Sequence, residues 1–450
     1  MVNGSSLRPR LKVTADGEGI GGHCGTRLLA DVADAVGLTA GLVAAMAPIC
    51  QGPRVHAPGR VLLDVALMLA DGGDCLSDLV TLGDQPALFG PVASIPTAYR
   101  VIHAVDDARL AAIRAARAAA RARAWRLGAA PTSITLDFDA TLLTAHSVKE
   151  QAAATYKHGF GFYPLGCWLD ETNEALAAVL RPGNAGSGTA ADHVEVLDLA
   201  LAQLPVDPVG VDPDAGVAML ARADSAGASH EFLDALRARG IEFSVGLPVT
   251  EAVRLAILSV PKNRWVEAIN TDGDIREGAG IAELTSYLDL SGWPAGTRAI
   301  VRREQPHPGA QFSLFDPDGW RHQVFLTDSG DDDLAYLEAR HRGHARVEDR
   351  IRVAKDTGLE NLPFHCFADN AAWVELVMIA TDIISWTQTL TLGGEMAKAE
   401  PKRLRYCLLH VAGRISRTGR SVYLRLQRNW RWAGQLTAAF SQAAALAAIA

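Results

Sequence analysis

The residues best suited to chemistry are two aspartates, Asp137 and Asp139, in the apolar stretch SITLDFDATL (133–142). Apolar and polar side chains alternate here, which is typical of a buried strand with its polar groups on one face. Neighbouring buried carboxylates repel unless a cation or a proton neutralises them, so the strand indicates a divalent-metal site. The alternative is that both aspartates simply reach solvent at the end of the strand. Against it, ligands bind at the carboxyl ends of strands in open α/β sheets.

Two further acids follow later in the chain. Asp224 ends the apolar run VAMLARAD (217–224), so it also stands at the end of a predicted strand. An aspartate in that position also caps helices, and both interpretations stay open.

Glu348 lies in a predicted helix over Ala335–Thr357. Helical spacing there predicts one apolar stripe of Val347, Ile351 and Ala354, and a neighbouring stripe of Glu348, Arg352 and Lys355. An exposed, salt-bridged helix would have the same pattern.

The elements before the acidic strand are predicted to be helical. Residues 1–128 are predicted to form a mainly helical DNA-binding region. Within it, Arg27–Met46 fits two short helices around Gly37, either a helix-turn-helix or an ordinary helical hairpin. The Ala/Arg-rich helix Ala108–Arg126 is predicted to expose a basic surface.

From residue 129 the pattern becomes α/β. Residues 129–249 are predicted to form the first part of a catalytic core, with strands Tyr163–Leu169 and Ala175–Leu180 after the acidic strand and then a helix. Three antiparallel strands followed by a helix are typical of the opening of a ribonuclease-H-like fold. Residues 250–335 are predicted to be a β-rich insertion, and residues 336–450 the C-terminal part of the core with a basic region. The insertion strands are expected at Trp265–Ile269, Thr297–Glu304, Gln311–Phe315 and Trp320–Thr327.

The charge is unevenly distributed. The net charge is −8, yet residues 131–339 carry −17 and residues 340–450 carry +7. Between Lys398 and Arg431 ten basic side chains, Arg417 and Arg420 among them, face Glu400 as the single acid. Such clustering is expected of a surface that contacts the DNA backbone, although a solvated basic face would have the same composition.

Composition places the chain among well-folded globular proteins, with 49% hydrophobic and 21% charged residues. The six cysteines are scattered without CxxC spacing, so neither a zinc ribbon nor a disulfide framework is indicated. We find neither a signal peptide nor an apolar run long enough to cross a bilayer, so a cytoplasmic protein without a membrane partner is expected.

With Asp139, Asp224 and Glu348 in this order, the chain resembles the DDE transposases of bacterial insertion sequences. The most similar branch is transposase DDE domain group 1, the insertion-sequence thirteen-eighty family. The resemblance covers essentially the whole chain and rests on the segments LDFDATLLTAHSVKE, YKHGFGFYPL, LRPGNAGSGTAADH, ARADSAG, HRGHARVEDRIRVAKDTGLENLPFH and NAAWVELV.

The resemblance implies a ribonuclease-H-like core in which Asp139, Asp224 and Glu348 hold two Mg²⁺ or Mn²⁺ ions. Hard carboxylate oxygens suit these ions. Two ions about 4 Å apart support an in-line phosphodiester displacement. The choice of Asp139 over Asp137 rests on the family's D-x-T pattern, which Asp139 and Thr141 meet. The implied partners are double-stranded DNA at the terminal inverted repeats and target, and a second protomer in a homodimer.

Related transposases carry the helix signature Tyr, two residues, Arg, three residues, Glu, six residues, Lys. Here that spacing falls on His341, His344, Glu348 and Lys355, so the first two positions depart from the pattern. The resemblance implies DNA contacts for Lys355, Arg352 and the two histidines. It also implies an aromatic side chain in the insertion that stacks on a flipped base. Trp320, Trp265 and Trp293 lie there, and a core position is the alternative for each.

Two other functions fit part of the sequence. Asp137 to Thr141 also matches the DxDxT signature of haloacid-dehalogenase-like phosphatases, in which the first aspartate accepts the phosphoryl group. That family would leave the long region before Asp137 and the Glu348 helix unexplained. A transposase-derived DNA-binding protein without activity is the second alternative.

Overall fold

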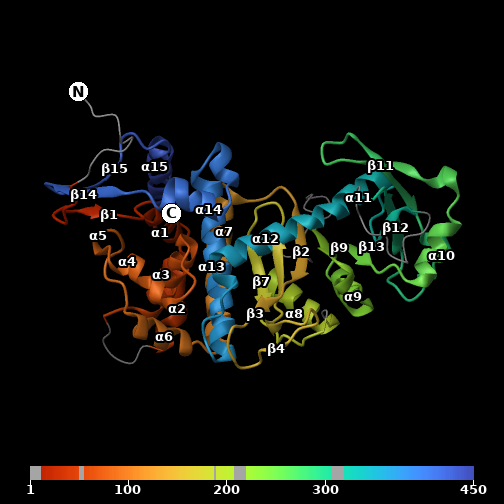
Figure 1. The fold of residues 1–450 in the computed structure, drawn as a ribbon, viewed down its shortest axis with the longest axis horizontal. Coiled ribbons are helices and arrows are strands. Elements are labelled where there is room, and N and C mark those ends of the chain that lie inside the picture. The colour runs from red at the N-terminus through yellow and green to blue at the C-terminus, as the bar shows by residue number, and fades with distance from the viewer. Residues whose placement is uncertain (1–11, 50–54, 187–188, 207–218, 307–318, 450) are drawn as a thin grey trace, which may run out of the picture.

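The computed structural model describes residues 12–49, 55–186, 189–206, 219–306 and 319–449. Figure 1 shows an elongated molecule with helices at one end, a sheet in the middle and further strands at the other end. The fold is mixed α/β. Its main sheet has nine strands in the order β10-β11-β12-β13-β9-β8-β2-β6-β7.

The centre of the sheet is built on the acidic strand. β2 (Ile134–Ala140) pairs antiparallel with β6 (Leu165–Leu169), which pairs antiparallel with β7 (Ala175–Val179). The helix α8 (Ala190–Leu201) follows, as the sequence pattern predicted. β8 (Met219–Ala223) then pairs parallel with β2, and β9 (Glu242–Leu247) pairs parallel with β8 across the helix α9 (His230–Ala238). A small separate sheet contains β3 (Leu143–Thr144), β4 (Ala153–Ala154) and β5 (Phe160–Phe162).

The segment after β9 extends the same sheet. After α10 (Glu251–Ser259) it contains β10 (Val266–Ile269), β11 (Ile275–Glu283), β12 (Arg298–Glu304) and β13 (Arg321–Thr327). β11 was not predicted, and the predicted strand Gln311–Phe315 lies outside the described residues. β13 pairs antiparallel with β9, which places Val324 opposite Leu247. The insertion therefore satisfies the backbone groups that β9 would expose as an edge strand.

The predicted helix over Ala335–Thr357 is divided. α11 (Leu334–Arg342) and α12 (Val347–Ala354) are separated by a 3-10 turn, Gly343–Arg346, and a π-helical turn, Lys355–Leu359, follows α12. The predicted apolar stripe of α12 is buried. α12 contacts β2, so the neighbouring stripe with Glu348 lies beside the sheet.

The long helix α13 (Phe367–Thr391) lies between the sheet and the N-terminal helices (Figure 1). It packs on β7, on α3 (Pro58–Asp71) and on α7 (Asp107–Ala124). The prediction that the arginines of α7 form an exposed basic surface is wrong for Arg117 and Arg121, which are buried. Carboxylates on α13 and beside β7 pair with both guanidinium groups, so charge alone did not indicate a surface position.

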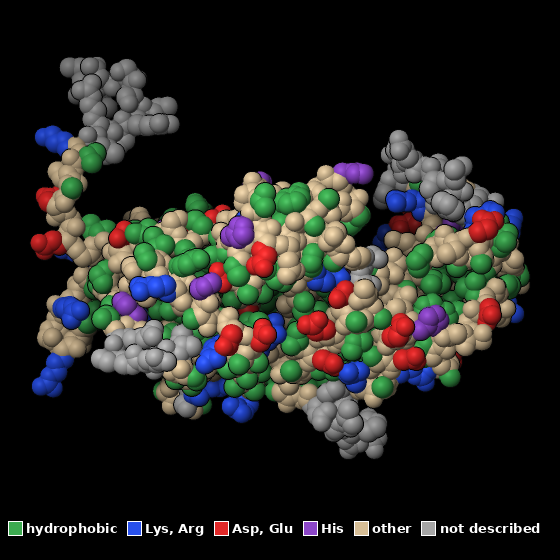
Figure 2. Space-filling view, turned by 90° about the horizontal axis from the view of Figure 1, so that it is seen from below, with side chains coloured by type: hydrophobic (Ala, Val, Ile, Leu, Met, Phe, Trp, Pro, Cys, Tyr) green, Lys and Arg blue, Asp and Glu red, His purple; other side chains and the backbone are tan. Residues whose placement is uncertain are grey.

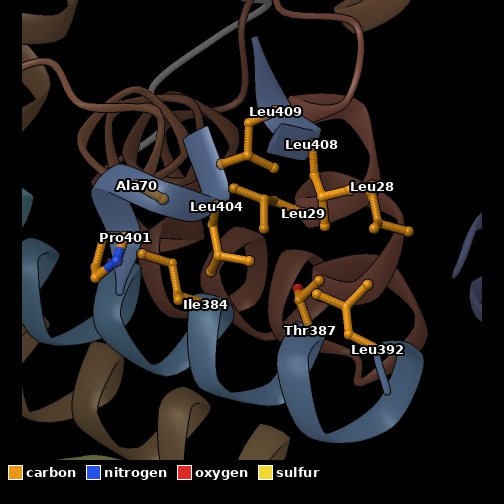
Figure 3. A pocket seen from close by; sticks show the side chains of 10 residues that line it. All are labelled: Leu28, Leu29, Ala70, Ile384, Thr387, Leu392, Pro401, Leu404, Leu408 and Leu409. Atoms are coloured by element: carbon orange, nitrogen blue, oxygen red, sulfur yellow. The ribbon is translucent and has the colours of Figure 1, made fainter. Parts of the chain in front are cut away.

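The C-terminal residues pack against the N-terminal helices. Figure 3 shows apolar side chains of α1 (Thr26–Ala35), α13, α14 (Pro401–Leu404) and the following turn meeting around one small pocket. The helix α15 (Ala433–Ile449) packs on α1. β14 (Gly413–Thr418) and β15 (Ser421–Leu426) form a hairpin that pairs with β1 (Ile20–Gly21). Through these contacts, β1 and α1 pack against β14 and α15, which lie far away in the sequence.

The helices α1 and α2 (Leu38–Met46) form the hairpin predicted around Gly37, which has φ 78°. α2 packs on α3 and α7, and its exposed side chains Ala40, Val43 and Ala44 are apolar. Without a cationic side chain, α2 lacks the phosphate contacts expected of a recognition helix. Within the described residues, no single helix meets the length and hydropathy needed to cross a membrane. α1 and α2 meet them only as a pair bent by 74°.

Candidate active site

The ends of two parallel strands bring the first two acids together. Phe138 of β2 is paired with Ala223 of β8, so the next residues, Asp139 and Asp224, stand side by side. Asp139 is still within β2, opposite Gly166 of β6, and Asp224 follows the end of β8. Asp139 is partly buried, and Asp224 is exposed. An oxygen of each carboxylate accepts a nearby backbone N–H, that of Ala140 at 2.7 Å and that of Ala226 at 2.9 Å. Asp224 therefore caps a short helical turn, as one of the two interpretations of this residue predicted, and its role as an active-site acid stays a prediction.

The third acid comes from α12. Burial raises the pKa of Asp139 to about 6, and the carboxylates of Asp224 and Glu348 contribute to the rise, against the lowering effects of the Ala140 N–H and His344. The carboxylates of Asp224 and Glu348 therefore lie close enough to Asp139 to act on it electrostatically. The oxygens of the three acids do not form a group in which every atom lies within 4.8 Å of every other.

Asp137 has a different environment from Asp139. It is 1% exposed, and Arg222 of β8 donates to both of its oxygens, at 2.8 and 2.7 Å. Nδ1 of His344 lies 3.0 Å from one of these oxygens. A carboxylate enclosed in this way is poorly placed to attack a phosphoryl group, which disfavours the phosphatase alternative.

Sequence reasoning missed Arg222 and its second partner, Asp170. Nη2 of Arg222 lies 2.8 Å from Asp170 Oδ2, and Nη1 donates to the Arg340 carbonyl. The signal was present, because an arginine inside the apolar run VAMLARAD requires a buried acidic partner. This ion-pair group connects β2, β8 and α11 directly beneath the three acids.

The two histidines of the predicted helix signature have different environments. His344 contacts Asp137 and acts electrostatically on Asp139. His341 stacks on Phe325 with ring centroids 4.3 Å apart, and its Nδ1 lies 2.9 Å from the Ser244 hydroxyl. Burial lowers the pKa of His341 to about 3. These contacts favour a packing role for a neutral His341.

The two cations after Glu348 differ in position. The Lys355 ammonium donates to the carbonyl of Leu142, just beyond the end of β2, at 3.2 Å. It therefore lies on the active-site side of the helix. Arg352 is 48% exposed and pairs with Asp349 and Glu400.

Comparison with known proteins places this geometry in a family. The model of transposase DDE domain group 1 matches residues 4–448. The chain belongs to this family. Among solved structures, this DDE-family chain is similar to a piggyBac transposase synaptic complex with hairpin DNA. The identity is 11%, the similarity covers 86% of this chain and 79% of that chain, and the TM-score is 0.39. No curated protein matches the chain.

The remaining predicted DNA contacts of this transposase-family chain lie away from the three acids. Trp320, at the start of β13, stacks on the Arg303 guanidinium at 4.8 Å, and Trp265 contacts the same group at 4.0 Å. Arg417 and Arg420 lie exposed on the β14–β15 hairpin. The fold thus brings Asp224, Glu348 and His344 within electrostatic reach of Asp139, and Lys355 bonds the backbone just beyond β2. Trp320, Arg417 and Arg420 lie on other elements, β13 and the β14–β15 hairpin.

Proposed function

We propose that this chain binds the terminal inverted repeats of a bacterial insertion sequence, cuts the DNA there and joins the 3′ ends to target DNA. The observation that supports the proposal most is the electrostatic influence of Asp224 and Glu348 on Asp139, in a chain of the DDE family. The strand order around β2, with three antiparallel and two parallel strands, is compatible with a ribonuclease-H-like core.

The donor set suits hard divalent cations. All three side chains offer carboxylate oxygens. Burial, with a contribution from the Asp224 and Glu348 carboxylates, raises the pKa of Asp139, so a cation would stabilise its charged form. Asp139, Asp224 and Glu348 would hold two Mg²⁺ or Mn²⁺ ions, which when bound activate a water or a 3′-hydroxyl and stabilise the leaving oxygen.

The surrounding side chains position the acids and the DNA. Arg222 and His344 hold Asp137, which fixes the strand that presents Asp139. Lys355 supplies a positive charge to a phosphate beside the scissile bond, as a compact ammonium group. The exposed oxygens of Asp224 and Glu348 leave the site open to a duplex.

The decisive test is strand cleavage of labelled DNA that carries the end of the element, with Mg²⁺ or Mn²⁺. We expect the native chain to nick this DNA only with the metal, and Glu348→Gln to lose at least about 10³-fold in rate while binding DNA normally. A loss of this size is about 4 kcal/mol of activation free energy, as expected when a metal ligand is lost.

The matched control is Glu360→Gln, which makes the same change at an exposed position just after the π-helical turn Lys355–Leu359. It should cut as the native chain does. Cleavage by Glu348→Gln at the native rate would contradict the assignment. DNA binding without cleavage by the native chain would favour the inactive alternative.

The β14–β15 hairpin is the proposed contact with the DNA backbone. Residues of one face are polar and exposed, with Ser416 partly buried, namely Arg414, Ser416, Thr418, Ser421, Tyr423 and Arg425. On the other face Ile415, Leu424 and Leu426 pack on the core, with Arg417 farther out and Arg420 at the turn. Figure 2 shows Lys and Arg side chains at the end of the molecule where Figure 1 places this hairpin. A two-stranded ribbon of this kind fits a DNA groove.

Replacing two of the four hairpin arginines, in Arg417→Ala/Arg420→Ala, should weaken DNA binding on the order of tenfold. The slope of log K against log salt should fall by about 2, because two phosphate contacts and their released counterions are lost. Fluorescence anisotropy over a salt series measures both quantities. The control Arg239→Ala/Arg254→Ala removes the same charge from arginines paired with Asp198 and Glu251, and should leave the slope unchanged. An unchanged slope in the hairpin variant would exclude these contacts.

Two DNA ends must meet during transposition, so we propose a homodimer as the active assembly. A symmetric pair of protomers is the simplest arrangement that presents two equivalent sites.

A further inference from the structure

A second group of possible metal ligands lies far from the three acids. It joins His23, before α1, Asp71, the last residue of α3, and His410, at the end of the turn after α14. Nδ1 of His23 is 2.6 Å from Asp71 Oδ2, and Nε2 of His410 is 3.2 Å from Asp71 Oδ1. All three ligand atoms lie within 4.8 Å of one another. Three segments distant in sequence therefore direct two imidazoles and one carboxylate at one point.

The backbone holds this group in place. The N–H of Cys24 donates to the Val411 carbonyl at 3.0 Å, and that of Gly25 donates to the Leu409 carbonyl at 3.0 Å. A Cβ at Gly25 would lie 1.9 Å from the Leu408 carbonyl oxygen, so this close approach requires glycine. His23 has φ 52°, in the left-handed region that a non-glycine residue adopts at an energetic cost. In this conformation Nδ1 of His23 lies beside the Asp71 carboxylate.

The surroundings of Asp71 orient its carboxylate. The Thr26 hydroxyl donates to Oδ1. Arg405 donates instead to the carbonyls of Leu69 and Ala70, so it binds the C-terminal end of α3 and leaves both carboxylate oxygens facing the histidines and Thr26. Oriented carboxylates of this kind are usual in metal sites.

An ion pair with Asp71 accounts for one histidine but not for both. Nε2 of His410 also lies 2.9 Å from the backbone carbonyl of Asp71, a hydrogen bond that it would exchange for the cation. The ring centroids of the two histidines are 4.0 Å apart, so two protonated imidazoles would repel each other beside a single carboxylate. Two neutral imidazoles at this distance can both donate lone pairs to one cation. Asp71 is 4% exposed at its side chain and the histidines are 34% and 36% exposed, so an ion would have protein on one side and water on the other.

We propose that His23, Asp71 and His410 bind one Zn²⁺ ion, with water in the fourth position. Two imidazoles and a carboxylate are a donor set for zinc and related transition metals, whereas the all-oxygen set of the three acids suits Mg²⁺ or Mn²⁺. Ligands at about 2.0 Å in a tetrahedron lie about 3.3 Å apart, so small side-chain shifts suffice to admit the ion. Because His23 follows β1 and His410 precedes β14, the ion would fix the base of the basic hairpin.

The test is zinc binding by the full chain after removal of metals with a chelator. Isothermal titration should give one Zn²⁺ per chain at this site, in protein carrying Glu348→Gln to weaken zinc capture by the three acids. In that background His23→Gln and His410→Gln should each weaken binding at least tenfold. The control is His103→Gln, because His103 also pairs with an aspartate, Asp369, but has no second histidine there. It should bind zinc normally.

A second measurement keeps the test decisive when a variant folds poorly. Zn²⁺ should raise the thermal unfolding midpoint of the chelator-treated parent, and Mg²⁺ at the same concentration should not, because a ligand that binds only the folded state stabilises it. Absence of zinc binding, or equal binding in the parent and in both folded variants, would overturn the proposal. Neither result bears on cleavage by the three acids, so the proposed transposase function is tested separately.

Discussion

Asp382→Ala should lower the free energy of unfolding by about 3–5 kcal/mol, one of the largest effects expected for a substitution outside the active site. Asp382 of α13 is fully buried and accepts from Arg117 at 2.8 Å, from Arg121, and from the Ala175 N–H at 2.9 Å. The variant leaves two buried guanidinium groups short of a counter-charge. Because this cluster connects α7, α13 and β7, its loss should weaken the attachment of the helices to the sheet.

Urea denaturation followed by circular dichroism measures this loss. The matched control is Asp198→Ala, which removes an aspartate paired with Arg239 but 55% exposed at its side chain. A surface pair should change stability by no more than about 0.5 kcal/mol. A loss below about 1 kcal/mol for Asp382→Ala would contradict the view that this network is essential to the fold.

Asp137→Asn and Asp139→Asn should separate stability from catalysis. Asp139→Asn should reduce metal-dependent cleavage by about 10³-fold or more, because a carboxylate that would hold the proposed ions is lost. Asp137→Asn should instead lower the free energy of unfolding by about 3 kcal/mol, because Arg222 loses its doubly bonded partner.

The pKa of Asp139 fixes the sign of its effect on stability. Because burial raises the folded-state pKa from 3.8 to about 6, its stabilising contribution is complete below pH 3.8 and is lost as the pH rises through 6. At pH 8 without metal, the neutral amide of Asp139→Asn should therefore leave the unfolding midpoint unchanged or higher. Thermal unfolding in chelator and the cleavage assay, run on both variants, test the pair. Loss of cleavage in a stable Asp137→Asn, with cleavage retained by Asp139→Asn, would reverse the assignment.

Local features of this chain were determined by its sequence. The alternation around Asp137 and Asp139 specifies a strand, and the spacing of Val347, Ile351 and Ala354 specifies a helix with one buried face, because both patterns depend on the backbone repeat alone. Such patterns, together with the family resemblance, also indicated Asp224 at the end of a strand and Glu348 on a helix as the other candidate acids.

The tertiary structure decided which polar residues are buried and which are available. Asp137 and Asp139 lie on the same strand but have different neighbours. Arg222 and His344 enclose Asp137. Asp139 is instead influenced by the carboxylates of Asp224 and Glu348. Arg117 and Arg121 are buried because their acidic partners come from distant segments. β13 extends the core sheet because it meets the open edge of β9. The physical reason is common to all three: burial and pairing energies depend on partners far away in sequence, whereas strand and helix periodicity depends on near neighbours.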